Sequence, residues 1–422
     1  MTKITDIPAI RFKGFSDTWE QRKFDEVFDC TIPNNTLSRA ELNYESGSVR
    51  NIHYGDILIK YGSVVDVQND EIPFATGKSS DDFKGALLRD GDIIIADTAE
   101  DETTGKACEI GNSQGLDVVS GLHTMVCRPR NKMALGYLGY YLNSDAYHHQ
   151  LLPLMQGIKV LSLSRTNVQK TMVCYPKSKA EQQLIADCFR NLDNLITLHQ
   201  RKYDETKTLK KYMLQKMFPQ NGEKVPEIRF DGFTEDWEQR KLDDVLKRRI
   251  EQRQQSEEYP RLAFASGQGV IPLSERKTNN REQLTKDEYT KKYLVTELND
   301  IVYNPANVKY GAIDRNKCGR GVISPIYVTF TTNEVPGFIE RIVTSHDFQQ
   351  RALRFEEGTV TKRQSVNPED LVTLDILVAP KREEQQKIAT YFDALDHLIT
   401  LHQRKCDELR SVKKFMLQNM FI

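Results

Sequence analysis

Four acidic residues, Asp97, Glu100, Asp101 and Glu102, stand close enough in the chain to do chemistry. Carboxylates at this spacing could hold a divalent cation or form a nuclease cluster. The alternative is a solvated acidic turn, and the pattern favours it. Two adjacent histidines at 148–149 are a second candidate pair. They fall in an expected helix, where neighbouring residues face different directions, so they do not predict a shared site.

Motifs for nucleotide or cofactor chemistry are incomplete. Gly77-Lys78-Ser79 lacks the glycine that a phosphate-binding loop needs five positions before Gly77, which favours a turn. Tyr303-Asn304-Pro305-Ala306 lacks the final aromatic residue of the amino-methyltransferase tetrapeptide and is better explained as a strand end. The sequence contains no GxSxG or HExxH motif. An independent enzyme is therefore disfavoured, and we expect neither a catalytic residue nor a metal site.

Composition places the chain among ordinary globular proteins. It has 422 residues, of which 39% are hydrophobic and 28% charged, enough for two to four domains. No run of 18 apolar residues predicts a membrane span, and the N-terminus lacks the apolar core of a signal peptide. The seven cysteines are scattered and form no CxxC pair. These features predict a cytoplasmic protein that does not enter a membrane.

An internal repeat organises the chain. The heptapeptide ITLHQRK occurs at 196–202 and again at 399–405. The match extends without gaps from 180–218 to 383–421, with 25 identities in 39 positions. A second match joins 7–28 to 225–246, with 13 identities in 22 positions. Each copy is thus a lead-in, a variable block and a long segment, and two copies indicate an internal duplication.

Each long segment is predicted to be a helix with one apolar seam. The seam residues step by four and three positions, which is typical of a coiled coil. At 1.5 Å per residue each helix is about 57 Å long, and its most economical partner is its own twin. The seam also holds His199 and His402, which could relay protons or bind metal but are better explained as polar residues that fix the register. The predicted seam comprises Ile185, Phe189, Leu192, Ile196, His199 and Tyr203, and Ile388, Phe392, Leu395, Ile399, His402 and Cys406.

The variable blocks, about 24–178 and 242–381, have the composition of mixed, β-rich domains. Short apolar runs entered through turns predict strands at 55–62, 90–97, 123–129, 297–304 and 324–330. Longer periodic runs predict helices at 136–152 and 337–353. Gly157 and Gly358 follow these helices at matching positions. We therefore expect an α+β fold in which two blocks share an architecture and differ in residues.

The paired motifs resemble those of the specificity subunits of type I restriction–modification enzymes. The resemblance rests on the lead-ins, Pro8 to Trp19 and Pro226 to Trp237, and on the EQQxIA openings at 181–186 and 384–389. Each opening is followed by FxxLDxLITLHQRK. These motifs are long and doubly present, and the resemblance covers almost the whole chain.

The resemblance implies an architecture and a set of partners. Two target recognition domains would each bind one half of a split site in double-stranded DNA, and two antiparallel helices would set the spacer, with pseudo-twofold symmetry. The expected division is a first recognition domain with its lead-in (1–179), a central helix (180–222), a second recognition domain with its lead-in (223–382) and a C-terminal helix (383–422). Two methyltransferase subunits would bind S-adenosylmethionine and methylate adenine N6. Two restriction subunits would use ATP and Mg²⁺. The chain itself would bind no cofactor and would supply the address in a host-defence system.

Candidate base-contacting residues are polar or basic side chains at strand ends and in glycine-flanked loops. Arginine and lysine pair with guanine in the major groove, and asparagine and glutamine pair with adenine. Many of them could instead be solvated loop residues. The candidates are Lys60, Tyr61, Ser63, Lys106, His123, Lys159 and Arg165 in the first block, and Asn304, Asn307, Lys309, Arg320, Lys362, Arg363 and Gln364 in the second.

Charge and the two tryptophans leave alternatives open. The second block has 24 basic against 20 acidic residues between 240 and 382, whereas the first has 17 against 20 between 22 and 179. The isolated chain is therefore expected to bind DNA poorly. Trp19 and Trp237 could anchor the methyltransferase or could be local core residues. A protein-interaction scaffold without DNA recognition is the alternative function.

Overall fold

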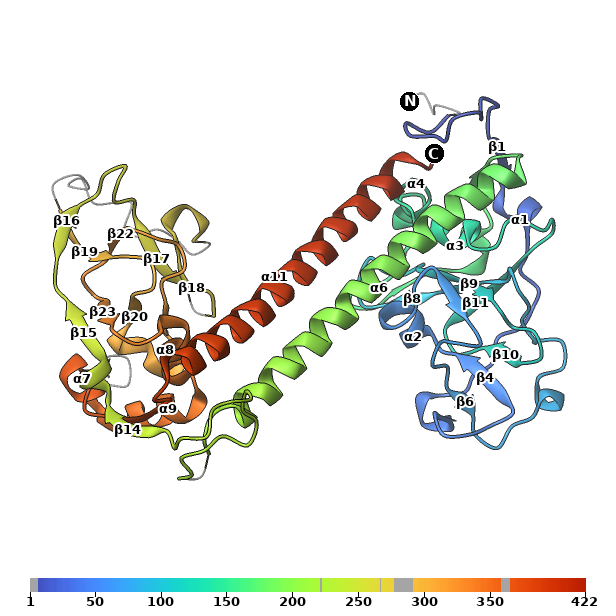
Figure 1. Cartoon of the computed structure of the whole chain (residues 1–422). Coiled ribbons are helices and arrows are strands. Elements are labelled where there is room, and N and C mark those ends of the chain that lie inside the picture. The colour runs from blue at the N-terminus through green and yellow to red at the C-terminus, as the bar shows by residue number, and fades with distance from the viewer. Residues whose placement is uncertain (1–6, 221, 266, 277–290, 358–364) are drawn as a thin grey trace. The chain divides into compact units, whose positions relative to one another are not determined.

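The computed structural model describes residues 7–220, 222–265, 267–276, 291–357 and 365–422 (Figure 1). The chain divides into two compact units. Unit 1 comprises residues 1–200 and 403–422, and unit 2 comprises residues 201–402. Each unit therefore combines one variable block with parts of both long helices.

Unit 1 is built on a five-stranded sheet with the strand order β2-β11-β7-β9-β5. Its central strand β7 has the sequence IIIA and is buried along its whole length, as expected for a strand covered on both faces. Neighbouring strands are antiparallel except for β5, which runs parallel to β9. The strands are β2 (Phe28–Asp29), β5 (Val64–Asp66), β7 (Ile93–Ala96), β9 (Ala107–Gly111) and β11 (Thr124–Pro129).

A second sheet of unit 1 has four short strands in the order β10-β4-β6-β3. Val49, Ala75 and Val119 of this sheet form a small apolar cluster with Phe83. The strands are β3 (Leu42–Asn43), β4 (Val49–Ile52), β6 (Phe74–Ala75) and β10 (Asp117–Ser120).

Unit 2 is built on a four-stranded antiparallel sheet in the order β15-β23-β20-β21. It also has a three-stranded sheet in the order β16-β19-β22. The four-stranded sheet of unit 2 has the same topology as strands β2-β11-β7-β9 of unit 1. In both, the strands taken in chain order are arranged first, fourth, second and third across the sheet. The strands are β15 (Leu246–Arg249), β16 (Gln252–Gln254), β19 (Lys292–Thr296), β20 (Ile301–Tyr303), β21 (Ile313–Arg315), β22 (Gly321–Ile323) and β23 (Val328–Thr332). The remaining strands pair as β17 (Leu262–Ala265) with β18 (Gly269–Pro272) and β24 (Glu356–Glu357) with β25 (Ser365–Val366).

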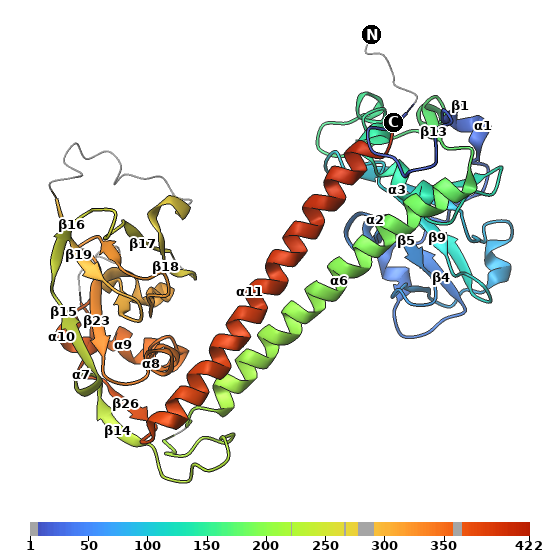
Figure 2. The same ribbon diagram turned by 45° about the horizontal axis from the view of Figure 1, so that its top comes forward.

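Both lead-ins end in the same small element. The tetrapeptide EQRK forms β1 (Glu20–Lys23), which pairs antiparallel with β13 (Met172–Tyr175), as Figure 2 shows. The second EQRK forms β14 (Glu238–Lys241), which pairs antiparallel with β26 (Asp375–Val378). A one-turn helix follows in each case, α1 (Phe24–Val27) or α7 (Leu242–Val245). The duplicated lead-ins therefore occupy equivalent places in the two units.

The two long helices are α6 (Lys179–Lys216) and α11 (Arg382–Asn419), each of 38 residues. The helices predicted at 180–218 and 383–421 are confirmed to within two residues. Among the described residues, no helix combines the length and apolar character that crossing a membrane requires. The structure is thus the mixed helix-and-strand fold that the sequence predicts.

The predicted seam residues are buried or half-buried. Ile185 and Phe189 lie in the apolar core of unit 1, and Ile388 and Phe392 lie in that of unit 2. In unit 1, Asp193 of α6 binds Lys413 of α11, and Gln200 accepts a hydrogen bond from Arg410 at 3.0 Å. These pairs step in opposite directions, so the two helix segments of unit 1 run antiparallel.

In unit 2 the other halves of the helices also run antiparallel. Lys210 of α6 binds Asp396 of α11. Phe218, just beyond α6, lies 6.1 Å from Phe392, measured between ring centroids. Asp396 and Lys210 are the repeat equivalents of Asp193 and Lys413, so each unit uses the same pair of residue types at this contact.

Three of the predicted elements need correction. The segment 55–62 is the helix α2 (Tyr54–Ile59) and not a strand, because the His53 ring accepts a hydrogen bond from Gly55 N at 3.2 Å and caps it. The helix predicted at 136–152 divides into α3 (Tyr137–Leu142) and α4 (Asp145–His148). The helix predicted at 337–353 divides into α8 (Pro336–Val343) and α9 (His346–Ala352). Ser144 and Ser345 cap the second helix of each pair.

Candidate nucleic-acid interface

An ion pair joins the lead-in of unit 1 to the start of α6. Arg11 Nε donates to Glu181 Oε1 at 2.6 Å, and Nη2 donates to Oε2 at 2.9 Å. Gln182 accepts from Ala134 N at 3.0 Å and donates to Pro176 O at 2.8 Å. The EQQxIA opening therefore fixes α6 to the lead-in and to two segments of the first block.

Unit 2 repeats this joint with the equivalent residues. Arg229 donates to Glu384 at 2.7 and 2.9 Å. Gln385 accepts from Val335 N at 3.1 Å and donates to Ala379 O at 2.8 Å. The duplicated motifs are thus attachment points, and what each block presents elsewhere differs between the copies.

The two tryptophans belong to the cores of the units. Trp19 is 6% exposed and lies edge-on to Tyr137 and Phe421, with ring centroids 6.3 and 6.4 Å away. Trp237 is 1% exposed and packs in the same way against Phe218 and Phe338. Their indoles have the position expected of local core residues. Their burial argues against docking of a partner on these two side chains.

The candidate residues of the first block divide by exposure. Lys60, His123 and Lys159 are exposed, whereas Ser63 and Arg165 are half-buried. Tyr61 is buried, and its hydroxyl donates to Glu71 O at 3.4 Å. Lys106 Nζ donates to the carbonyls of Leu58 and Tyr61, and burial lowers its pKa. Lys106 and Tyr61 therefore stabilise the position of α2 from the interior of unit 1.

A hollow beside α2 gathers cations around an exposed aromatic ring. Tyr44 is 43% exposed, with Lys60 Nζ 4.6 Å and the Arg39 guanidinium 5.6 Å from its ring centroid. Asp56 accepts from Arg39 at 2.6 and 2.8 Å and orients it. A stacking ring between two cations is the kind of surface that nucleic acids contact. Of these residues only Lys60 was predicted from the sequence, because Tyr44 lies 16 positions away from it along the chain.

A second exposed group lies around His123. This residue has a positive φ of 54°, which is rare outside glycine and often occurs at functional sites. Its ring lies 5.3 Å from the Tyr54 ring, edge to face, and 3.5 Å from Thr98 Oγ1. Burial lowers the pKa of the adjoining His53. Aromatic, hydroxyl and imidazole groups thus converge from three separate segments.

Three candidates of the second block have protein partners. Asn304 is half-buried and caps a helical turn by accepting from Ala306 N at 3.1 Å. Arg320 is exposed and pairs with Glu258 at 2.8 Å, and Lys309 lies 3.5 Å from Glu356. Asn307 is exposed. Lys362, Arg363 and Gln364 lie outside the described residues.

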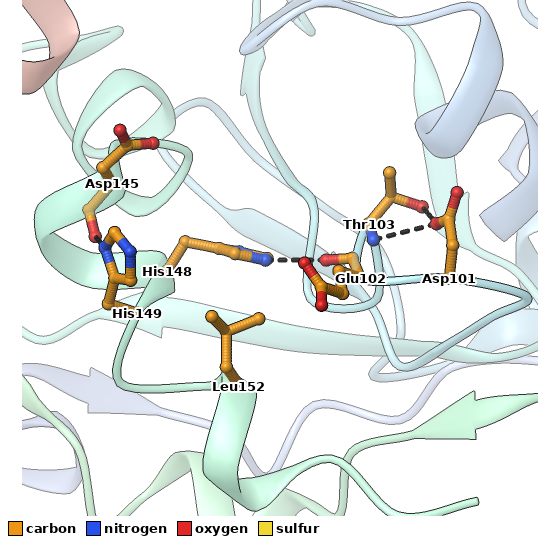
Figure 3. A pocket seen from close by; sticks show the side chains of 7 residues that line it. All are labelled: Asp101, Glu102, Thr103, Asp145, His148, His149 and Leu152. Carbon is orange, nitrogen blue, oxygen red and sulfur yellow. Dashed lines mark hydrogen bonds between the residues drawn. The ribbon is translucent and has the colours of Figure 1, made fainter. Parts of the chain in front are cut away.

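Asp101 and Glu102 of the acidic run line one shallow pocket with the histidine pair, as Figure 3 shows. His148 Nε2 is 2.7 Å from the backbone oxygen of Glu102, whereas His149 Nδ1 is 2.6 Å from that of Asp145. Asp101 accepts from Thr103 and closes a tight turn. Within the described ranges, no group of three or more His, Cys, Asp or Glu residues could hold a metal ion. The two histidines are thus engaged separately, as their adjacency predicts.

Comparison with known proteins shows which class of protein the chain resembles. Residues 16–208 match the model of the type I restriction modification DNA specificity domain. The inferred MjaX specificity subunit of a type I restriction enzyme from Methanocaldococcus jannaschii is 21% identical over 98% of this chain and 93% of its own length. The chain is therefore related to type I specificity subunits, as the paired motifs predict.

A solved structure shares the fold of this chain. The crystal structure of a type I restriction–modification system S subunit from M. genitalium has a TM-score of 0.62 with this chain. It is 11% identical, and the match covers 99% of both chains. At this identity the likeness shows a shared fold.

Proposed function

We propose that the chain is the DNA specificity subunit of a type I restriction–modification complex, in which each variable block recognises one half of a bipartite site. The joint between block and helix carries the proposal. Arg11–Glu181 and Arg229–Glu384 attach two blocks of different sequence to equivalent helix positions. The joints are equivalent, whereas the surfaces of the two blocks differ in sequence. This arrangement allows each block to recognise a different DNA sequence.

The helices set the distance between the half-sites. The equivalent pairs Asp193–Lys413 and Lys210–Asp396 support an antiparallel coiled coil with pseudo-twofold symmetry. A helix of 38 residues is about 57 Å long, which corresponds to on the order of 15 base pairs. Joining two readers by a stiff spacer makes the spacing itself part of the specificity.

Two methyltransferase subunits bind equivalent surfaces of the helices, and two restriction subunits join them. S-adenosylmethionine, ATP and Mg²⁺ are bound by these partners, and this chain performs no catalysis. A second apolar stripe on each helix supports the docking: Leu195 and Leu198 on α6, and their equivalents Leu398 and Leu401 on α11, are each more than a third exposed. Apolar residues three apart and exposed on a helix suit a helical partner.

The proposal is tested by expressing the chain with its methyltransferase subunit and mapping methylated adenines across a genome. We expect one bipartite motif with an unread spacer. A motif without a spacer, or no methylation that depends on this chain, would contradict the proposal. Replacing Leu195 and Leu198 by serine, and separately Leu398 and Leu401, should each lower the number of methyltransferase subunits bound. Unchanged stoichiometry in both variants would exclude this docking surface.

The spacer is tested by inserting one heptad of residues after Arg201 and another after Arg404, which are equivalent positions of the repeat. Seven residues keep the apolar repeat and add about 10 Å, or about three base pairs. The modified motif should keep both half-sites and gain a longer spacer. An unchanged spacer would refute the role of the helices as a ruler.

A scaffold that binds proteins and not DNA is the alternative. The acidic balance of the first block, 17 basic against 20 acidic residues, is the observation that favours it. A DNA footprint of the complex with methyltransferase distinguishes the two, because a scaffold leaves the DNA unprotected.

A further inference from the structure

A rigid hairpin with an apolar tip projects from unit 1. Its second arm is β12 (Leu161–Ser162), which pairs antiparallel with β8 (Thr98–Ala99). The turn is closed by two backbone hydrogen bonds between Gln156 and Ser162, at 3.0 and 2.8 Å. Thr104 Oγ1, in the loop before β9, donates to Leu161 O at 3.4 Å, and Leu163 N donates to the backbone oxygen of Asp97, just before β8, at 2.8 Å. The tip is therefore held in place from both sides.

Gly157 allows the chain to turn at the tip. Its φ is +126°, and a Cβ at this position would lie 1.9 Å from Val160 O. A residue with a side chain would have to open the turn. The conformation of the tip therefore requires a glycine at position 157.

The tip exposes apolar side chains to solvent, which is unfavourable unless a partner covers them. Ile158 is 100% exposed and Val160 is 51% exposed, with the exposed Lys159 between them. The side chains of two β-branched residues separated by one position have few rotamers to lose when a partner binds. The tip is therefore preorganised for contact with an apolar group.

The hairpin shares an edge with the group around His123. Ser162 pairs with Thr98, and Thr98 Oγ1 lies 3.5 Å from the His123 ring. Tyr54 packs edge to face against His123. Hydrogen-bonding groups and an apolar tip are thus placed side by side, which is the combination that a base-pair edge offers in the major groove.

We propose that the tip at 156–162 enters the major groove of the half-site recognised by unit 1, and that Ile158 contacts the C5-methyl group of a thymine. This inference rests on the proposed function. The major groove admits a two-stranded β-ribbon, and the thymine methyl is the apolar group that base pairs present there.

The test uses the complex of the full chain with its methyltransferase and the bipartite motif found by methylation mapping. Each thymine of the first half-site is replaced in turn by deoxyuridine, which lacks only the methyl group. We expect the wild-type complex to lose affinity at one position, by about three-fold or more. Ile158→Ala should bind the thymine site more weakly and should no longer distinguish thymine from uracil at that position.

Ile7→Ala is the matched control, because Ile7 is 47% exposed in the same unit but lies in the lead-in before β1. It should keep the full thymine preference. A half-site without an A·T pair, or a thymine preference that survives Ile158→Ala, would overturn the inference while leaving the proposed function intact. A uniform loss of affinity in Ile158→Ala, with increased 2-aminopurine fluorescence in the wild-type complex, would instead indicate a wedge between base pairs and would also overturn it. Absence of any bipartite motif would count against the proposed function itself.

Discussion

Arg11 and Glu181 form a two-point ion pair across 170 residues of sequence, with N–O distances of 2.6 and 2.9 Å. The side chains are 10% and 1% exposed, so the pair is shielded from water. Arg229 and Glu384 form the same pair in unit 2, with side chains 10% and 0% exposed. A carboxylate this deeply buried needs its cationic partner, because an unpaired buried charge is costly.

Arg11→Ala should destabilise unit 1 by on the order of 3 kcal/mol, because it leaves the Glu181 carboxylate buried without its partner. Denaturant unfolding of the purified chain measures the loss. Arg22→Ala is the control, since Arg22 pairs with Glu20 but is 52% exposed, and it should cost much less than Arg11→Ala. Equal costs for the two variants would mean that burial does not determine the worth of these pairs.

Phe421→Ala should loosen unit 1 while leaving unit 2 intact. The Phe421 ring packs against Trp19, Tyr141 and Phe189, with centroids 5.6 to 6.4 Å apart, and truncation leaves a cavity that costs on the order of 3 kcal/mol. The chain has two tryptophans, one in each unit, so fluorescence reports on each unit separately. In a Trp237→Phe background, the remaining Trp19 emission should shift to longer wavelength.

The matched variant is Phe218→Ala in a Trp19→Phe background, where Trp237 is the reporter. Phe218 lies 5.6 Å from Trp237 between ring centroids, so this variant should shift the emission of Trp237. If Phe421→Ala changed the emission of Trp237 instead of Trp19, the assignment of the C-terminal residues to unit 1 would be wrong.

Charge exchange should test the helix contact inside each unit. Lys413 binds Asp193, which also accepts from the Tyr140 hydroxyl at 2.9 Å. Asp193→Lys should destabilise unit 1, and the second change Lys413→Asp should restore about 1 kcal/mol. A double-mutant cycle by chemical denaturation gives the coupling energy. Combining Asp193→Lys with Lys210→Asp, whose own partner Asp396 lies in unit 2, should restore nothing.

Long-range periodicity made the helices and the repeat predictable. The four–three spacing from Ile185 to Tyr203 gave α6 almost to its ends, because a seam of that length admits one period only. The duplicated lead-ins and EQQxIA openings indicated an internal duplication, and their role as attachment points came from the structure. Their chemistry, a buried arginine–glutamate pair, was not predictable, because nothing local to Arg11 points to a residue 170 positions away.

Short segments were less predictable, because side chains outside the segment's own pattern decide its structure. The apolar run at 55–62 suits a strand as well as a helix, and the cap from the His53 side chain decides for the helix. Ser144 and Ser345 divide two predicted helices, since a serine inside a periodic run can also cap a new helix. Tyr44, Tyr54 and Ile158 were missed as surface candidates, because their places depend on the turns and strand pairings that hold them.

Stability should also depend on pH through Glu109. Burial raises the pKa of this carboxyl from its ordinary 4.5 to about 7, although Gly139 N donates to it at 2.9 Å. Between these two values the folded state holds a proton that the unfolded state has released, so the contribution of Glu109 falls as the pH rises from 4.5 to 7. Glu109→Gln removes this dependence. Relative to wild type, the variant should gain about 3 kcal/mol of unfolding free energy between pH 4.5 and pH 7.5.

The measurement compares denaturant unfolding of the two proteins at a series of pH values, so that contributions from other carboxylates cancel. Glu41→Gln is the opposite case, because hydrogen bonds from Ser38 lower the pKa of Glu41. That stabilisation is present above the unfolded pKa and is lost as the pH falls, so the Glu41→Gln variant should lose stability relative to wild type as the pH rises. The two differences must therefore slope in opposite directions. If the difference for Glu109→Gln were flat across this range, Glu109 would be charged in the folded protein. Water would then have to reach its carboxylate between Gly139 and the strands around β9.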